Sequence, residues 1–373
     1  MIGGSDNGRS GIRKRGGRRP AAGAADSADR SVATPAAAPG PGCTLALMGD
    51  VMLGRLVDAR LAERGYGYPW GDVLPLLRAA DLRLVNLECA LTEATDPWRD
   101  GAYRTFHFRA RPAAVETLRL AGVDFASLAN NHVCDYGFEG MAEMLGVLDR
   151  AGIAHAGAGS HLATARAPAR LAAGGVRVAV VALADSPPGY AATPESPGIH
   201  YVPVPPKPSA LAEVAAAVAE AKRGADLCVV SAHGGPNLRD RPPREFRDLA
   251  RRLIEAGADV FWGHGAHVVQ GIEWHAGRPI LYDTGDMVDD YEVDETLRND
   301  LSAVFLLRAG PAGVESLHVV PVAIADMRAE VARGRARAWL ARKLAELCAE
   351  LGTEVRDEGH ALRVAPAAGG SVK

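Results

Sequence analysis

Short apolar runs alternate with helical patterns between residues 44 and 263, and this alternation constrains the fold more than any other feature of the sequence. The apolar runs are β-rich and as short as buried strands, and they cover residues 44–51, 82–87, 123–129, 176–184, 226–232 and 258–262. Helical patterns fill several of the intervals, over residues 112–121, 140–151, 209–223 and 243–256. The sequence therefore predicts an α/β fold.

The pattern changes after Val268, where helical segments give way to closely spaced apolar runs. Residues 269–275, 279–282, 303–307 and 316–322 are typical of successive strands joined by short turns, which predicts an antiparallel second sheet. A final helix is predicted over residues 327–351, because Leu340, Leu344 and Leu347 fall on one face. We expect this last helix to contribute packing and no chemistry.

Composition and charge narrow the classes of protein that this chain can be. The 373 residues are 48% hydrophobic and 23% charged, as in a globular protein of one large or two modest domains. A formal net charge of −3 gives no sign of nucleic-acid or membrane-surface binding. Residues 1–42 are rich in Gly, Ala, Pro and Arg, and are predicted to be a disordered basic tail. No run of 18 apolar residues is present, so we expect no membrane span and a cytoplasmic location.

Side chains that bind metals recur where the predicted strands end. Asp50 ends the first apolar run and Glu88 the next. Further along the chain, four more such side chains lie at or just after the ends of predicted strands: Asn131, His233, His264 and His267. Ligand sites in open α/β sheets form at these strand ends, which favours a metal-dependent enzyme. For any single residue a structural role, such as capping the next helix or making a turn, is an equally good interpretation, and only the ordered set favours the site.

Several motifs of the chain, taken together, carry a family resemblance. They are Gly49-Asp50-Val51-Met52-Leu53-Gly54-Arg55, Asn86-Leu87-Glu88, Ala129-Asn130-Asn131-His132, His233-x-Gly235-Pro236-Asn237 and Gly263-His264-x-x-His267-Val268. In these motifs, spread over residues 43–322, the chain resembles the CapA (poly-γ-glutamate capsule synthesis) family of the calcineurin-like metallophosphoesterase group. The resemblance implies a four-layer α-β-β-α sandwich with mixed sheets. We place this domain at residues 43–325, a C-terminal helical extension at 326–362 and a flexible tail at 363–373.

The same resemblance implies a site and its cofactor. The metal-ligand positions of the family fall on Asp50, Glu88, Asn131, His233, His264 and His267. Two divalent ions are implied, and ligation by both oxygen and nitrogen suits Mn, Fe or Zn. His132 matches the position that protonates the leaving group, and Asp135 is expected to orient its imidazole.

Three further residues are candidates for substrate binding: Arg55, Asn237 and Arg298. Arg55 has two interpretations, because it could hold a substrate anion or neutralise Asp50. Arg298 lies in a segment, from Asp289 to Asp300, that looks specific to this variant. Its guanidinium could meet a substrate carboxylate or phosphate, and a solvated loop charge is an equally good interpretation.

The chain departs from the family pattern at several positions. Met52 stands where the broader phosphoesterase group has a histidine, so one metal would lose a ligand. Gly234 stands where the CapA family often has tryptophan, which removes a wall from the pocket. His264 and His267 are three residues apart, whereas some relatives space them by two, so either the geometry shifts or one histidine lies behind the other. A Thr-Gly-Asp segment ending at Asp286 replaces a more usual Leu-Gly-Asn.

Three functional classes remain open at the level of the sequence. The first, which we favour, is a metal-dependent hydrolase in which a metal-activated hydroxide attacks a phosphoester. The second is a metal-dependent γ-glutamyl or amide hydrolase, or an amide-transfer enzyme, acting on a small molecule or peptide. The third is a non-catalytic accessory module of polymer biosynthesis. The expected partner is a small-molecule or peptide substrate, γ-glutamyl or phosphorylated, and no nucleic acid.

Overall fold

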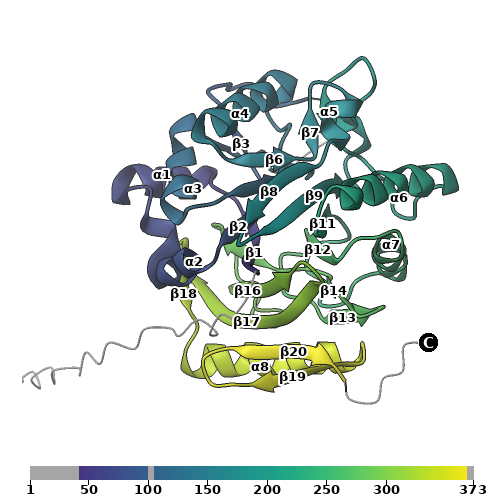
Figure 1. The fold of residues 1–373 in the computed structure, drawn as a ribbon. Coiled ribbons are helices and arrows are strands. Elements are labelled where there is room, and N and C mark those ends of the chain that lie inside the picture. The colour runs from purple at the N-terminus through teal and green to yellow at the C-terminus, as the bar shows by residue number, and fades with distance from the viewer. Residues whose placement is uncertain (1–41, 100–104, 368–373) are drawn as a thin grey trace, which may run out of the picture. The chain divides into compact units, whose positions relative to one another are not determined.

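Two mixed β-sheets face each other in the computed structural model, which describes residues 42–99 and 105–367 (Figure 1). Contacts between the sheets include a hydrogen bond between the hydroxyls of Ser127 and Ser231 (2.8 Å) and one from Trp262 Nε1 to the carbonyl of Met48 (3.1 Å). The α/β sandwich implied by the family resemblance is confirmed. The predicted tail at residues 1–42 lies outside the described residues except for its last position, Gly42.

The first sheet has the strand order β19-β20-β17-β16-β1-β2-β5-β6, with β15 paired to β1 and β18 to β17. Its parallel half begins at β1 and continues through β2, β5 and β6, whereas β16 joins β1 in the antiparallel direction. The bounds of the parallel half and β15 are Cys43–Val51 (β1), Leu82–Leu87 (β2), Phe125–Ser127 (β5), Ala154–Ala156 (β6) and Asp286–Val288 (β15). The remaining strands are Leu301–Gly310 (β16), Gly313–Ala325 (β17), Arg328–Val331 (β18), Thr353–Asp357 (β19) and Leu362–Pro366 (β20).

The second sheet has the strand order β13-β14-β12-β11-β9-β8. Strands β9, β11, β12 and β14 run parallel, and the edge strands β8 and β13 run antiparallel to their neighbours. The bounds are Ala169–Ala173 (β8), Val176–Ala184 (β9), Leu227–His233 (β11), Val260–His264 (β12), Ile272–His275 (β13) and Arg278–Leu281 (β14). Two short pairs complete the strands: Ala90–Leu91 (β3) with Arg109–Ala110 (β4), and Ala158–Gly159 (β7) with Gly198–Ile199 (β10).

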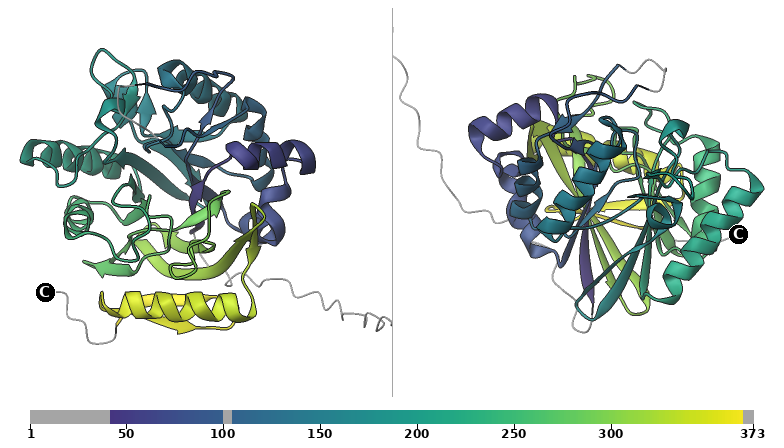
Figure 2. Two further views of the ribbon diagram at one scale, coloured as in Figure 1. Left: turned by 180° about the vertical axis from the view of Figure 1, so that it is seen from behind. Right: turned by 90° about the horizontal axis from the view of Figure 1, so that it is seen from above.

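Helices cover the outer faces of the two sheets (Figures 1 and 2). Those associated with the first sheet are Arg55–Arg64 (α1), Leu74–Ala79 (α2), Val115–Ala121 (α3) and Gly137–Ala151 (α4). The second sheet is covered by Pro208–Arg223 (α6) and Arg244–Glu255 (α7), which contact β9, β11, β12 and β14. Leu162–Arg166 (α5) packs on β7, and Gly334–Ala349 (α8) packs on β17 and β19. Short 3-10 turns lie at Tyr68–Val73, Pro112–Ala114 and Pro188–Tyr190.

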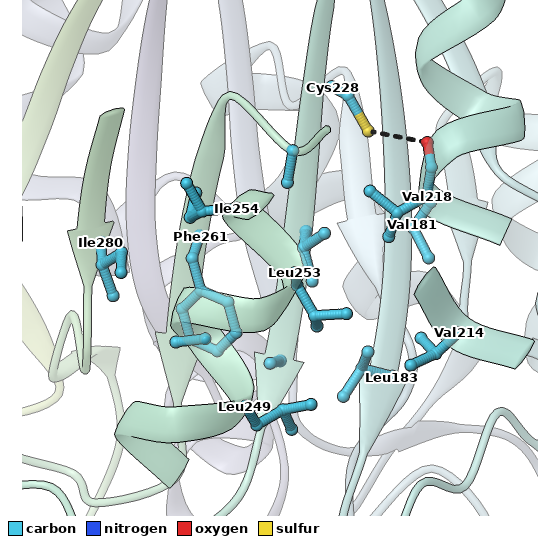
Figure 3. Packing of buried hydrophobic residues seen from close by; sticks show 14 of the residues in the cluster. Val181, Leu183, Val214, Val218, Cys228, Leu249, Leu253, Ile254, Phe261 and Ile280 are labelled. Carbon is cyan, nitrogen blue, oxygen red and sulfur yellow. Dashed lines mark hydrogen bonds between the residues drawn. The ribbon is translucent and has the colours of Figure 1, made fainter. Parts of the chain in front are cut away.

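The core beneath α7 shows why that segment is a helix (Figure 3). Its apolar residues recur every three or four positions, so Leu249, Leu253 and Ile254 fall on one buried face. This face packs on the strands that carry Phe261 and Ile280. Burial of these side chains holds α7 against the sheet, and each fully buried leucine contributes about 1.5–3 kcal/mol.

Three predictions about the C-terminal part of the chain are wrong. The four runs after Val268 do not form one antiparallel sheet: β13 and β14 extend the second sheet, whereas β16 and β17 join β1 in the first. The predicted helix over residues 327–351 begins only at Gly334, because Arg328–Val331 pairs with β17 as β18. Residues 363–366, predicted to belong to a flexible tail, lie in β20, and residues 368–373 lie outside the described residues. Local periodicity does not specify a strand's partner, and the partner decided all three cases. Among the described helices, none is both long and apolar enough to cross a membrane.

Candidate metal centre

The carboxyl ends of four central strands meet at one edge of the sandwich. Asp50 lies near the end of β1, and Glu88 follows β2 directly. In the facing sheet His233 and His264 end β11 and β12, where they are register partners. Parallel pairing therefore places these four side chains at the same level of the structure, as expected for a site in an α/β sheet.

Two groups of buried side chains at this edge could each hold a metal ion. One consists of Asp50, Glu88 and His233, and the other of Asp50, His267 and Asp286. Within each group the ligand atoms lie within 4.8 Å of one another. Asp50 belongs to both groups, so it could contribute a ligand atom to either of them.

Asp286 is the ligand candidate that the sequence prediction missed. Its carboxylate Oδ1 lies 2.9 Å from His267 Nδ1, because β15 pairs with β1 and places Asp286 opposite Asp50. Gly49 permits this close approach, since a Cβ at that position would lie 1.8 Å from the carbonyl oxygen of Gly285. The signal in the sequence is a carboxylate shortly after the predicted strand at 279–282, within the segment that departs from the family pattern.

Unsatisfied polar atoms test whether these residues fit a metal. Asp50 Oδ2, Glu88 Oε1, Asp286 Oδ2 and His264 Nε2 are buried and make no hydrogen bond within the part of the chain that the structure describes. Buried carboxylate oxygens without partners are costly unless a cation satisfies them. The mixed oxygen and nitrogen donors suit a divalent transition metal. The residues present therefore fit a bound divalent cation.

Burial and mutual charge shift the titration of these groups in different directions. Burial would raise the pKa of Asp50, but the neighbouring imidazoles of His264 and His267 hold it below its ordinary value. Burial raises the pKa of Glu88 well above its ordinary value. Burial lowers the pKa of His233 to about 3, so its imidazole is neutral at ordinary pH. Burial also acts to lower the pKa of His267, but the charges of Asp286 and Glu88 outweigh it and raise the pKa.

Two buried asparagines hold this arrangement together. Asn86 Nδ2 donates to Asp50 Oδ1 (2.8 Å) and lies 3.1 Å from His233 Nδ1, so it links ligands from both sheets. Asn130 Nδ2 donates to the carbonyl of Leu87 (2.8 Å), and its Oδ1 accepts the backbone N–H of His132 (3.0 Å). The sequence motifs contained both asparagines, but their role in positioning the ligands is visible only in the structure.

His132 and Asp135 form the predicted pair beside the metal ligands. His132 Nδ1 lies 2.5 Å from Asp135 Oδ2, and its Nε2 lies 4.0 Å from Glu88 Oε1. Asp135 also accepts the hydroxyl of Tyr190 (3.0 Å) and the backbone N–H of Phe108 (2.7 Å). The ring of Phe108 stacks on the imidazole with centroids 3.9 Å apart. These contacts fix the imidazole with Nε2 directed toward Glu88, a candidate metal ligand, which is the orientation that a proton donor beside the metal would need.

A cavity of about 450 Å³ opens onto this centre. Its walls combine aromatic, charged and amide side chains, which are Arg55, Phe106, Phe108, His132, Asn237, Leu238, His267, Asp290, Tyr291, Glu292 and Asn299. The volume is that of a small-molecule site. The wall contains His132, the candidate proton donor, and His267, a candidate metal ligand, so the cavity reaches both parts of the candidate site.

The three predicted substrate-binding residues occupy different places. Arg55 lines the cavity and forms an ion pair with Asp290, not with Asp50, and its Nε donates to Asp290 Oδ2 (3.1 Å). Asn237 is exposed and lines the cavity. Arg298 donates to both oxygens of Asp300 (2.6 and 2.7 Å) and does not line the cavity. The structure thus brings two of the three to the same space.

The departures from the family pattern have structural correlates. Met52 is buried, and its sulfur accepts the backbone N–H of Gly54 (3.1 Å). At Gly234 the space of a side chain is taken by Asp185, whose carboxyl carbon would lie 2.6 Å from a Cβ.

The altered histidine spacing also has a structural consequence, because the two imidazoles contact opposite oxygens of Asp50. His264 Nδ1 lies 3.4 Å from Oδ1, and His267 Nδ1 lies 3.3 Å from Oδ2. His267 reaches this position with a φ of 58° in the left-handed region. Asn131 is half-buried between Asn130 and His132, and its ligand role stays a prediction.

Comparisons with known proteins agree with the resemblance seen in the motifs. The model of the family described as "Bacterial capsule synthesis protein PGA_cap" matches residues 44–291. A protein of Mycobacterium tuberculosis named "Probable polyglutamine synthesis accessory protein" is 33% identical over 87% of this chain and 96% of its own length. The "PGA biosynthesis protein CapA" of Bacillus subtilis is 30% identical over 74% of this chain and 70% of its own length. The "Capsule biosynthesis protein CapA" of Bacillus anthracis is 30% identical over 76% and 68%.

Proposed function

Because this chain belongs to the bacterial capsule synthesis family PGA_cap, we propose that it is a metal-dependent hydrolase whose reaction takes place in the cavity beside Asp50 and His132. The observation that carries the proposal is the pair of buried ligand groups that share Asp50. A shared carboxylate between two ligand sets is the arrangement of binuclear hydrolytic sites. We assign one divalent transition-metal ion to each group, with His264 and Asn131 as further ligands.

The chemistry divides between the metal and the side chains. Divalent ions bound by Asp50, Glu88, His233, His267 and Asp286 would activate water and polarise the oxygen of the scissile group. His132 holds a proton on Nε2 and gives it to the leaving group as the bond breaks. Asp135 accepts the Nδ1–H of His132 and stabilises the imidazolium before the transfer.

Arg55 supplies the hydrogen bonds that orient the substrate. Its Nε and Nη2 are engaged by Asp290, whereas its Nη1 donates to no residue in the described ranges. Asp290 and the rings of Phe106 and Phe108 (5.2 and 5.1 Å from the guanidinium carbon) hold the guanidinium in place. The free edge of the guanidinium can therefore donate to a substrate oxygen without first being ordered.

The first candidate reaction is hydrolysis of a phosphoester. The second is hydrolysis or transfer at a γ-glutamyl amide, and two observations favour keeping it. The relatives named above carry polyglutamine and PGA synthesis in their names. In addition, the guanidinium of Arg55 in the cavity wall is already paired with Asp290, so additional negative charge on a phosphoryl group would rely on the metals.

A substrate panel on metal-reconstituted protein tests the proposal and separates the two reactions. The panel pairs p-nitrophenyl phosphate and bis-p-nitrophenyl phosphate, which release p-nitrophenolate, with γ-glutamyl-p-nitroanilide, which releases p-nitroaniline. Both products are yellow and are followed by their absorbance. We expect turnover that a chelator abolishes and that Mn²⁺ or Zn²⁺ restores. Release from the anilide alone would assign the second reaction. No release from any substrate, with metal bound, would contradict the hydrolase and leave the accessory role that the mycobacterial relative carries in its name.

A further inference from the structure

Tyr291 lies at the junction of the cavity and the candidate metal centre, and the proposed reaction assigns it no role. It follows β15 closely and lines the cavity. Its hydroxyl lies 3.5 Å from Glu88 Oε2. The edge of its ring meets the imidazole of His267, with centroids 5.2 Å apart and planes at 74°. The phenol therefore reaches the place where ligands from both groups converge.

The ring of Tyr291 is held from several directions. The guanidinium carbon of Arg55 lies 5.7 Å from its centroid, and the ring of Phe108 lies 5.8 Å away. The backbone N–H of Tyr291 donates to Asp289 Oδ1 (2.7 Å). A hydroxyl on a ring fixed in this way has a defined position, which is what preorganised donation requires.

The hydroxyl keeps capacity to donate. An oxygen–oxygen distance of 3.5 Å to Glu88 is well beyond the 2.7–2.8 Å of a strong O–H···O hydrogen bond, so the present contact is weak. A phenol carries its proton at neutral pH, because its ordinary pKa is about 10, so the hydroxyl of Tyr291 is a donor.

We propose that Tyr291 is a further catalytic residue, which donates its phenolic hydrogen bond to the oxygen of the scissile phosphoryl or carbonyl group as negative charge develops on it. The role rests on the proposed hydrolysis. The proton stays on Tyr291 throughout. Water supplies the new bond to phosphorus or carbon, and the leaving group departs with the proton from His132. A neutral donor stabilises such an oxygen in the same way as the donors of an oxyanion hole.

The variant Tyr291→Phe tests this role, because it removes the hydroxyl and keeps the ring against Arg55, Phe108 and His267. With the substrate found by the panel, we expect kcat to fall roughly 10²-fold, the effect of losing one oxyanion donor, and KM to change less than about threefold. Metal content per chain should equal that of the wild type. Tyr68→Phe is the matched control, because its hydroxyl bonds to Asp326 away from the cavity, and it should leave kcat unchanged.

A binding measurement makes the test independent of turnover. Inorganic phosphate, titrated into the metal-loaded proteins by calorimetry, should bind about tenfold more weakly to Tyr291→Phe, because one hydrogen bond to a charged oxygen is lost. Equal phosphate affinity and equal kcat in the two proteins would overturn the proposal. Loss of metal from Tyr291→Phe would also overturn it, because the hydroxyl would then act only through Glu88.

The failure of this role and the failure of the proposed function give different results. Weaker phosphate binding by the variant, with no turnover of any substrate by the wild type, would show that the hydroxyl of Tyr291 donates to a bound oxyanion, but it would contradict the hydrolase and with it the catalytic role. Turnover by the wild type that Tyr291→Phe leaves intact would support the hydrolase and contradict the donor role. A wild type that neither binds phosphate nor turns over a substrate would contradict both.

Discussion

Asp50 and Asp286 are register partners on the parallel strands β1 and β15, and both carboxylates contact the imidazole of His267. This pairing brings a residue from the C-terminal part of the chain into a site whose other carboxylates come from the first hundred residues. With Asp286 included, the buried side chains form two candidate ligand groups that share Asp50. A substitution at Asp286 therefore tests how many metal sites the chain has.

Replacing Asp286 by asparagine should remove one metal site and spare the other. The substitution keeps the shape of the side chain but removes the charge, so metal content should fall from about two ions per chain toward one. Elemental analysis of protein purified without chelator measures this directly. Asp300→Asn is the control, because Asp300 is an acidic residue that pairs with Arg298. This variant should keep the metal content of the wild type. Equal metal content in Asp286→Asn and the wild type would show that Asp286 is not a ligand.

Removing His132 should abolish turnover without releasing metal. His132→Ala is expected to lower kcat by roughly 10²–10⁴-fold, the usual contribution of a positioned general acid. The loss should be larger for substrates with alkoxide leaving groups than for those with p-nitrophenolate, because a good leaving group needs no proton. Steady-state kinetics on matched esters measures the difference. A loss of the same size for both leaving groups would argue against a role in proton donation.

Arg55 and Arg298 are expected to behave differently although each is paired with an aspartate. Arg55→Ala should raise KM by about tenfold or more, because its guanidinium lines the cavity and loses a charged hydrogen bond to substrate. Arg298→Ala should leave KM and kcat within about twofold, because its guanidinium is engaged by Asp300 outside the cavity wall. Steady-state kinetics on the two variants measures whether KM rises in each, and their melting temperatures confirm that both are folded. A rise in KM in Arg298→Ala would restore the sequence prediction for that residue.

His200 should make the fold sensitive to mild acid. Burial lowers the pKa of His200 from 6.5 to about 4, and its Nδ1 lies 2.9 Å from the carbonyl oxygen of Ala182. Between these values only the unfolded chain takes up the proton, so the free energy of unfolding falls as the pH drops from about 6.5 to 4. The full effect is roughly 3 kcal/mol.

Denaturant unfolding of the wild type and His200→Gln at several pH values measures this contribution. The variant is expected to be less stable at pH 7 but to lose less stability on acidification. His233 titrates in the same range in both proteins, so the difference between the two pH profiles isolates His200. Parallel profiles for the two proteins would contradict the assignment.

The sequence predicted elements better than it predicted their partners. The strands that became β1, β2, β9 and β11 were placed within a residue or two of their bounds, because continuous apolar runs ending in a polar side chain are local patterns. The four runs after Val268 were recognised as strands but assigned to one sheet. Strand pairing depends on contacts between distant segments, and no local period encodes those contacts.

The candidate site shows the same division between local pattern and tertiary contact. The sequence alone predicts candidate ligands at strand ends, from Asp50 to His267, and the family resemblance implies the roles of His132 and Asp135. Tertiary structure alone added Asp286, assigned the guanidinium of Arg55 to Asp290, and left Arg298 outside the cavity wall. The reason is physical: a strand end is fixed by which of its own neighbours are buried. The position of the Asp286 side chain, in contrast, depends on how closely β15 approaches Gly49 on β1. Only the folded chain sets that approach.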